Sequence, residues 1–290
     1  MTKSAIKKMK KKRVIILGSN GFISSHVEKI LKDKNISILS FPRKKLDLVS
    51  EGAIKTLKKI IRQNDYIFFA AAKAPVKNIE MLIYNLKMLR IVSESIKSCK
   101  IKKIVYLSSD AVYADTKKKI SEKSIVCPNS LHGIMHLIRE NYLERIFKNK
   151  LCVIRPTLVF GPSDPHNGYG PNRFIREIKK NKNIYLFGKG EEKRDHIFIN
   201  DLSYFISDLI LNNFYGKINI ATGKVNTFYS IAKRIVSISG KKIKIKFIKR
   251  NEPMPHLGLR SFNVNKLKKL FPKYHLNSLA KTINNNFHKY

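Results

Sequence analysis

Short apolar runs alternate with amphipathic segments along the first 160 residues of the chain. The apolar runs are rich in β-branched and aromatic residues and occupy 13–17, 35–40, 66–70, 104–107 and 151–156. Between them, apolar residues recur at helical spacing over 22–31, 51–63, 79–96 and 131–147. Strands that alternate with helices in this way form parallel sheets with helices on both faces. The pattern therefore predicts an α/β fold built on a doubly wound parallel sheet.

The character of the sequence changes after Gly161-Pro162. Residues 163–173 are rich in glycine, proline, asparagine and histidine, which predicts an irregular loop. The further elements that we expect are at 172–180, 201–211, 218–220, 230–237 and 242–248, followed by a C-terminal helix. The predicted divisions are a basic flexible tail at 1–12, a first domain at 13–165 joined by about 197–222, and a smaller α/β lobe formed by 166–196 and 223–290.

A glycine turn follows the first apolar run. Gly18 permits a tight turn, Gly21 lets a pyrophosphate approach the backbone, and the helix that begins at Phe22 and Ile23 offers free N–H groups. The third glycine of such motifs is Ser24 here, a residue small enough to keep the helix close to the strand. The turn predicts a dinucleotide site in a Rossmann sheet. The alternative is an ordinary buried strand followed by a turn.

Length and composition are those of a globular protein. The chain has 290 residues, of which 43% are hydrophobic, and no apolar run approaches the ~20 residues that span a bilayer. The first 12 residues are basic and lack the apolar core of a secretory signal. Three cysteines without metal or redox spacing favour a reducing cytoplasm. We therefore expect a cytoplasmic protein without membrane insertion.

The formal net charge of +39 raises the question of a nucleic-acid partner. The basic residues are mostly lysine and are spread along the whole chain, as a compositional bias toward Lys, Ile and Asn would produce. They do not gather in one tract with interleaved aromatics. We expect nonspecific binding at low salt and no specific nucleic-acid function.

The end of the second apolar run bears on the choice of cofactor. NAD-binding sheets carry an acidic residue there, about 20 residues after the glycines, for the ribose 2′-hydroxyl. Here Ser40 leads instead to Arg43, Lys44 and Lys45, and Asp47 comes only later. A missing carboxylate with basic groups suits a 2′-phosphate and favours NADP over NAD. The alternative is lysine drift in a surface loop.

Several stretches together resemble the NAD-dependent epimerase/dehydratase group of the extended short-chain dehydrogenase/reductase family. They are Gly18–Ser24, Ala70–Ala72, Asn85, Ser108–Tyr113, Arg155–Pro162, Gly188–Asp195 with Asn200-Asp201, and Arg260 with Asn263-Val264. The resemblance implies an enzyme that uses NAD or NADP to move a hydride at a carbon of a nucleotide sugar. The cofactor-binding residues that it implies, together with the basic loop, are Gly18, Ser19, Asn20, Gly21, Phe22, Ile23, Arg43, Asp47, Leu48, Ala70, Ala71, Ala72, Asn85 and Pro156.

The sequence departs from this family at its catalytic pair, Tyr-x-x-x-Lys. His132 and His136 occupy the two positions, within a segment whose Gly133 and Glu140 fit the family pattern. Histidine has an unperturbed pKa near 6.5, so it needs no neighbouring cation to act as acid or base at neutral pH. We expect His132 to be the acid/base and His136 to contact the nicotinamide ribose. Three alternatives stay open: a binding protein without turnover, a metal site that uses His132, His136, His166 or His196, and an active enzyme in which the two histidines are structural.

One serine, Ser109, and one aspartate, Asp110, complete the predicted chemistry. Ser109 would bind the sugar oxygen that gains or loses the proton. Asp110 stands where the family's dehydratases have their acid, but their following glutamate is Ala111 here. This favours epimerisation or keto reduction over 4,6-dehydration.

The resemblance also implies how substrate and subunits bind. Arg194 and Arg260 would face the nucleotide diphosphate, since two arginines suit phosphate oxygens, and Asn172 and Phe174 would line the same cleft. The helices at 79–96 and 131–147 are apolar around most of their circumference. We therefore expect a homodimer formed through these helices.

Overall fold

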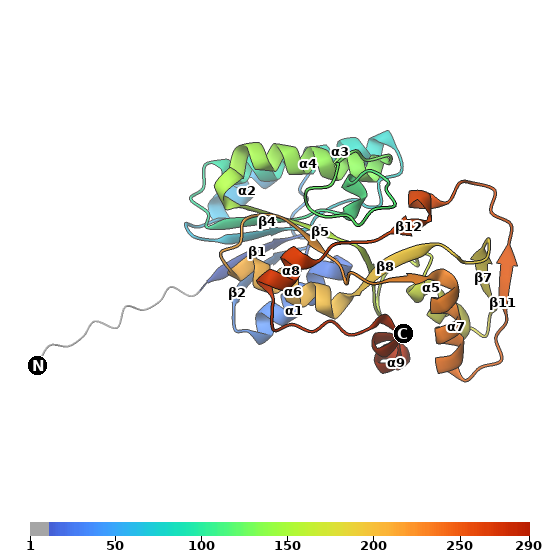
Figure 1. The fold of residues 1–290 in the computed structure, drawn as a ribbon. Coiled ribbons are helices and arrows are strands. Elements are labelled where there is room, and N and C mark those ends of the chain that lie inside the picture. Colours follow the sequence, from blue (N-terminus) through green and yellow to red (C-terminus); the bar gives the residue numbers. More distant parts are fainter. Residues whose placement is uncertain (1–11) are drawn as a thin grey trace, which may run out of the picture.

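A six-stranded parallel sheet forms the centre of the molecule, a computed structural model that describes residues 12–290 (Figure 1). Its strands lie in the order β2-β1-β3-β4-β5-β9. Their bounds are β1 (Arg13–Leu17), β2 (Ser37–Phe41), β3 (Tyr66–Phe69), β4 (Lys103–Leu107), β5 (Leu151–Pro156) and β9 (Gly216–Ile220). β2 and β3 leave β1 on opposite sides, and open sheets of this kind bind ligands at the carboxyl ends of the strands beside such a reversal. The predicted basic tail at 1–12 lies outside the described residues, except for Lys12.

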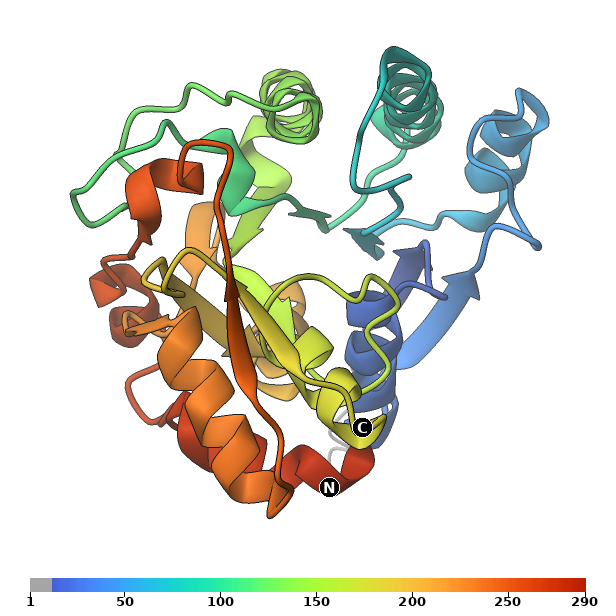
Figure 2. The same ribbon diagram turned by 90° about the vertical axis from the view of Figure 1, so that its right-hand side faces the viewer.

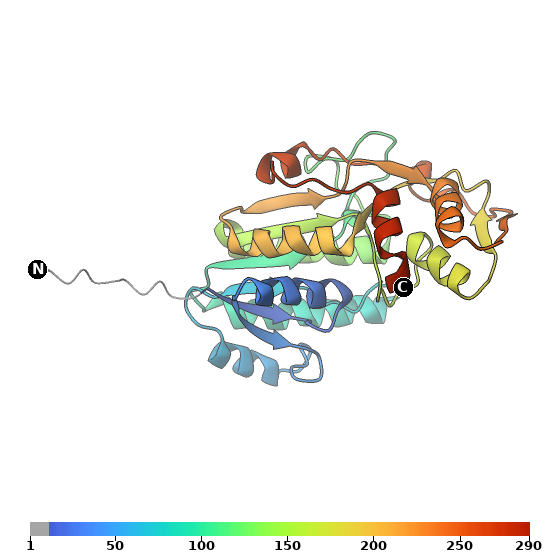
Figure 3. The ribbon, with the colours of Figure 1, turned by 90° about the horizontal axis from the view of Figure 1, so that it is seen from below.

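Helices cover both faces of the sheet. On one face, α2 (Gly52–Ile60), α3 (Ile79–Lys97) and α4 (Leu131–Phe147) enclose one apolar core. On the other face lie α1 (Phe22–Asp33) and α6 (Ile199–Leu211), which Figure 3 shows side by side in front of the strands. The doubly wound parallel sheet predicted from the sequence is thus confirmed.

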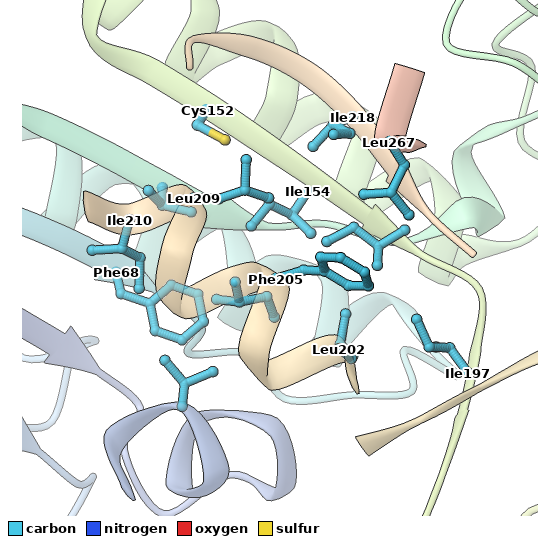
Figure 4. Packing of buried hydrophobic residues seen from close by; sticks show 14 of the residues in the cluster. Phe68, Cys152, Ile154, Ile197, Leu202, Phe205, Leu209, Ile210, Ile218 and Leu267 are labelled. Carbon is cyan, nitrogen blue, oxygen red and sulfur yellow. The ribbon is translucent and has the colours of Figure 1, made fainter. Parts of the chain in front are cut away.

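The core between the sheet and α6 is dense with large apolar side chains. Phe68 and Ile154 of the sheet meet Leu202, Phe205 and Leu209 of the helix (Figure 4). All five are at most 2% exposed. Burial of each such side chain contributes about 1.5–3 kcal/mol. These contacts hold β3, which lies between β1 and β4 in the sheet, and β5 against α6.

A smaller lobe follows β5 and is seen face-on in Figure 2. In its four-stranded sheet, β8 (Lys193–Phe198) pairs with β6 (Leu158–Phe160), β10 (Val225–Thr227) and β12 (Leu259–Arg260), while β7 (Ile184–Phe187) pairs with β11 (Ile245–Ile248). Besides α6, the helices after β6 are α5 (Pro171–Lys179), α7 (Phe228–Ser239), α8 (Asn265–Leu270) and α9 (Leu279–Asn286). A third apolar core lies among α5, α7, α9 and β7.

Most predicted elements form close to their expected bounds. The helix at 131–147 begins and ends as predicted, because the Ser130 side chain accepts a hydrogen bond from the Gly133 N–H and caps it. The strand expected at 242–248 is shorter and spans only Ile245–Ile248. β8 was not predicted, because its sequence begins with charged residues and therefore lacks the apolar pattern of a buried strand. Within residues 12–290, no helix is long and apolar enough to cross a membrane.

Candidate active site

The turn after β1 has the geometry of a phosphate cradle. Gly18 adopts φ 88°, and a Cβ atom there would lie 2.7 Å from Cα of Ala71, so only glycine fits. Ser24 replaces the third glycine and donates a 2.6 Å hydrogen bond to the carbonyl of Gly18, which fixes the turn. α1 starts directly after Gly21 with no side-chain cap and no acidic residue in its first turn. Its N–H groups are therefore available to an anion.

A cavity of about 270 Å³ lies beside this turn. Nine of its lining residues belong to the predicted cofactor set: Gly18, Asn20, Gly21, Arg43, Asp47, Leu48, Ala70, Ala71 and Ala72. The residues that sequence reasoning missed are Phe41, Leu46, Lys73, Tyr84 and Met88. The structure thus brings together most of the predicted cofactor residues, and small side chains form the wall at the end of β3.

The charged side chains that line this cavity lie around Tyr84. The guanidinium of Arg43 lies 5.4 Å and the ammonium of Lys73 lies 5.2 Å from the centre of its ring. Asp47 lies 3.5 Å from the Tyr84 hydroxyl and contributes the carboxylate among the charged residues that line this cavity. Two cations and one carboxylate therefore flank the ring.

Five predicted cofactor residues do not line the cavity. Ser19 is 5% exposed, Phe22 and Ile23 pack into apolar cores, and Pro156 is buried in β5. Asn85 is fully buried and exchanges two hydrogen bonds with the backbone of Lys73, at 3.0 and 2.9 Å. Asn85 therefore holds the wall of the cavity in place from behind.

The motif residues on β4, α4 and β5 form one buried network. Glu140 accepts hydrogen bonds from Ser108 and from both Nε and a terminal nitrogen of Arg155. The Arg155 guanidinium lies 4.8 Å from the ring centre of Tyr113, whose hydroxyl donates to Asn219. Buried charges persist in proteins when they are paired and hydrogen-bonded in this way. The network fixes α4 relative to the strand that precedes Ser109.

The start of α4 packs directly on the turn that carries the predicted serine and aspartate. Ser109 caps this short turn, accepting a hydrogen bond from the Ala111 N–H, and Asp110 is its first residue. A Cβ atom on Gly133 would lie 2.7 Å from Cβ of Pro128 and 2.9 Å from the carbonyl carbon of Ala111. The glycine lets the helix and the turn touch, and this places His132 beside the turn.

His132 and His136 lie edge to face, with ring centroids 4.7 Å apart. Burial, His166 and Arg139 lower the pKa of His132 below 6.5, although Asp110 acts in the opposite direction. Burial, His132 and Arg139 hold the pKa of His136 well below 6.5. Both rings are therefore neutral at pH 7.

Hydrogen bonding distinguishes the two histidines. Nδ1 of His136 lies 2.7 Å from the hydroxyl of Tyr106. Nδ1 of His132 is buried without a partner in the part of the chain that the structure describes. Packing against His136 and the turn, rather than a hydrogen bond, therefore orients the His132 ring. Among residues 12–290, no group of three or more His, Cys, Asp or Glu side chains is arranged to hold a metal ion.

A second cavity, of about 610 Å³, lies in the smaller lobe. Its lining combines the aromatic side chains of Tyr169, Phe187 and Phe228 with the guanidinium groups of Arg194 and Arg250. Both arginines approach Glu192, and Arg250 reaches it at 3.5 Å. Arg194 pairs in register with Arg260, which donates to the Asp110 carboxylate at 3.1 Å, so one wall of this cavity adjoins the turn that carries Ser109. Asp110 accordingly raises the pKa of Arg194 against the larger effect of burial.

The other predicted substrate residues are placed differently. Arg260 is 2% exposed and donates to the Asp110 carboxylate at 3.1 Å and to the carbonyl of Ala114 at 3.2 Å, so it clamps the 110–115 turn and does not line the second cavity. Asn172 is buried and donates to Asp164 at 2.6 Å. Phe174 packs within the aromatic cluster behind the cavity. None of these three residues lines the second cavity.

The missed residues gave little signal in the sequence. Tyr84 and Met88 belong to a helix whose apolar residues looked like core. Lys73 follows the three alanines directly, and this adjacency could have indicated it. Arg250 belongs to one of many basic runs. Except for Lys73, only tertiary packing distinguishes these residues from their neighbours in the sequence.

The fold and the glycine cradle define a class of proteins with a dinucleotide-binding α/β domain. Residues 14–221 match the NAD dependent epimerase/dehydratase family, and the chain belongs to this family. The membership confirms the resemblance seen in the motifs.

Relatives and solved structures agree with this assignment. The uncharacterized UDP-glucose epimerase YtcB of Bacillus subtilis is 23% identical over 81% of this chain and 84% of its own. UDP-glucose 4-epimerase of Thermotoga maritima, solved with UDP-glucose, aligns with a TM-score of 0.84 at 21% identity over 96% of this chain and 98% of its own. UDP-glucose 4-epimerase of Thermus thermophilus, solved with NAD, aligns at 0.80 and 19% identity over the same shares. At these identities the structural likenesses show a shared fold.

Proposed function

We propose that this protein is an NAD(P)-dependent enzyme that epimerises or reduces a nucleotide sugar. The observation that carries the proposal is the contact between the Ser109–Asp110 turn and the arginine-lined strands, in a chain that also has a glycine cradle. Arg260 donates to Asp110 at 3.1 Å and pairs in register with Arg194, which lines the second cavity. Asp110 affects the pKa of both His132 and Arg194, which relates the turn to both. The relatives named above include nucleotide-sugar epimerases, which supports the same reaction class.

The glycine turn fits a dinucleotide. A Cβ atom at Gly18 would collide with Ala71, and the free start of α1 lies beside a cavity lined by small residues. The cofactor supplies hydride acceptance and donation when bound. The N–H groups of Gly18 and Gly21 already donate to the carbonyls of Phe41 and Gly18, so the backbone of Asn20 and the uncapped start of α1 would hold the phosphates. Ala70–Ala72 would let the cofactor lie close to the strand ends.

We propose NADP as the preferred cofactor. Arg43 and Lys73 line the cavity, and both cations lie over the Tyr84 ring. β2 ends without a carboxylate. Two cations suit the additional phosphate of NADP. The Thermus neighbour binds NAD, so the preference depends on residues particular to this chain.

The substrate would bind in the second cavity. Arg194 and Arg250 would contact the diphosphate, because guanidinium groups match phosphate oxygens, and the aromatic lining would contact the base. Ser109 has its hydroxyl proton free to donate, since its oxygen accepts from Ala111. We propose that Ser109 binds the reacting sugar oxygen and that His132 exchanges the proton with it. A neutral imidazole can accept that proton directly, without the cation that a phenol requires.

A binding protein without turnover is the second candidate function. The observation that favours it is the unpartnered Nδ1 of His132, because no described residue stabilises an imidazolium there by hydrogen bonding. This candidate predicts cofactor or nucleotide-sugar binding without hydride transfer. Turnover assays separate it from the enzyme.

Binding titrations test the cofactor assignment. We expect NADP to bind more tightly than NAD in calorimetry at physiological salt, and Arg43→Ser to weaken NADP about tenfold while NAD is unchanged, as expected for loss of one charge-assisted contact. Lys44→Ser is the matched control, because Lys44 carries the same charge one residue further and does not line the cavity. Equal affinity of the wild type for NAD and NADP would refute the NADP preference.

A further inference from the structure

The hydroxyl of Tyr106 and Nδ1 of His136 form a buried pair at 2.7 Å. Tyr106 is 1% and His136 5% exposed. Burial raises the pKa of Tyr106 and lowers that of His136, so both groups are neutral. One proton lies between the two atoms. It belongs either to the phenol, which then donates to nitrogen, or to Nδ1, which then donates to oxygen.

The surroundings of Tyr106 decide between these arrangements. If Nδ1 donated, the phenol hydrogen would be buried, and among residues 12–290 the structure gives it no other acceptor. A buried donor without an acceptor is strongly disfavoured. If the phenol donates, both atoms are satisfied, and the imidazole proton must lie on Nε2 because neutral histidine carries only one.

Arg139 acts in the same direction. This side chain is fully buried, and its guanidinium lies 5.0 Å from the ring centre of Phe69, which packs against Tyr106. In the described chain it forms no ion pair with a carboxylate. Arg139 also lowers the pKa of the Tyr106 phenol against the larger effect of burial, by its charge and by hydrogen bonding. This cation attracts the oxygen lone pairs and turns the hydrogen away, toward His136.

Arg139 also links the histidine helix to the wall of the first cavity. It donates to the carbonyl of Ala71 at 2.9 Å and to the carbonyl and side-chain oxygens of Asn85 at 2.7 and 3.0 Å. Asn85 in turn holds the backbone of Lys73. The position of His136 relative to the cavity wall is therefore fixed by hydrogen bonds through one side chain.

We propose that Tyr106 is a positioning residue that holds His136 in the Nε2–H tautomer, with Arg139 setting the direction of the phenol hydrogen. His136 then presents a neutral N–H donor to an oxygen of the bound dinucleotide or sugar. This donor role rests on the proposed function, whereas the tautomer follows from the protein alone. In the described residues Nε2 has no hydrogen-bond partner, so its proton is available to a ligand.

Nuclear magnetic resonance of the full chain without ligand tests the tautomer. Imidazole ¹⁵N shifts, assigned by the loss of signals in His136→Gln, should show an unprotonated Nδ1 and a protonated Nε2 in the wild type. Tyr106→Phe should produce a mixture of tautomers and weaken dinucleotide binding about two- to tenfold, the size of one neutral hydrogen bond. Tyr113→Phe is the matched control, because this buried hydroxyl donates to Asn219 and not to a histidine.

Two results would overturn the inference. One is a protonated Nδ1 on His136 in the wild type, a result that does not depend on the folding of any variant. The other is an unchanged tautomer ratio in a folded Tyr106→Phe protein. A wild type with Nε2–H that binds neither NAD nor NADP would instead refute the proposed function and the donor role, while the tautomer assignment would stand.

Discussion

Replacement of Gly133 by alanine probes the contact that places His132. The added Cβ would lie 2.7 Å from Pro128 and 2.9 Å from the backbone of Ala111. Carbon atoms pack best at about 3.5–4.0 Å, so the helix and the turn must separate by about 1 Å. Overpacking of this kind costs about 1–3 kcal/mol of unfolding free energy. Alanine's better helix propensity returns up to about 1 kcal/mol of that cost.

Gly52→Ala is the matched control. Gly52 begins α2, and a Cβ atom there would meet only Ser50 at 3.6 Å, an ordinary contact. This variant should be neutral or more stable by about 0.4–1 kcal/mol. Urea unfolding followed by circular dichroism measures both variants against the wild type.

Turnover adds a second readout for Gly133→Ala. A displacement of about 1 Å at reacting groups can cost about 10²-fold in rate. We therefore expect the turnover of folded Gly133→Ala to fall about 10²-fold. If Gly133→Ala unfolded at the same urea concentration as Gly52→Ala and kept full activity, the packing argument for His132 would be wrong.

Two further predictions concern pH and assembly. Because the pKa of His132 lies below 6.5, a His132 base stays unprotonated through neutral pH. Turnover in the direction that oxidises the sugar should therefore be flat from about pH 7 to 8 and fall as pH drops through that pKa. In that direction, an acid limb well above pH 7 would contradict a histidine base. Ile83 of α3 and Ile138 of α4 are 49% and 38% exposed, so we expect sedimentation at moderate salt to show a homodimer that Ile83→Lys with Ile138→Lys dissociates. Ile125→Lys, at a 77% exposed position on neither helix, should leave the dimer intact, and a monomeric wild type would refute the interface.

The sequence predicts the sheet because its signal is local. β1 and β3 are short apolar runs, and their side chains, apart from the partly buried Arg13, are buried as such runs require. α4 has a serine cap at its start and no proline within it. Elements of this kind follow from neighbouring residues alone. β8 shows the limit, because its charges become buried only when Arg194 pairs with Glu192 and Asp195 accepts from Thr222 and Gly223.

The parts of the site that depend on backbone geometry could be predicted from the sequence. The glycine turn and the alanines follow from residue size, and the cavity forms beside them. Arg260 was expected at the substrate because arginine suits phosphate, but its donors reach the turn at 110–115 instead. Arg139 carried no signal, since its partners Ala71 and Asn85 are distant in the chain. Long-range pairing decides which arginines face a ligand.

Hydride exchange is the measurement that tests the central claim most directly. The protein is incubated with oxidised NAD or NADP and a panel of nucleotide sugars, and mass spectrometry follows deuterium from the sugar carbon into the cofactor or back into an epimer. We predict exchange with at least one nucleotide sugar in the wild type. His132→Ala should lose about 10²–10⁴-fold of that rate, the usual contribution of general acid–base catalysis, with cofactor affinity unchanged. Exchange that is equally fast in His132→Ala would contradict the catalytic role of His132, and no exchange across the panel by a wild type that binds cofactor would identify a binding protein instead.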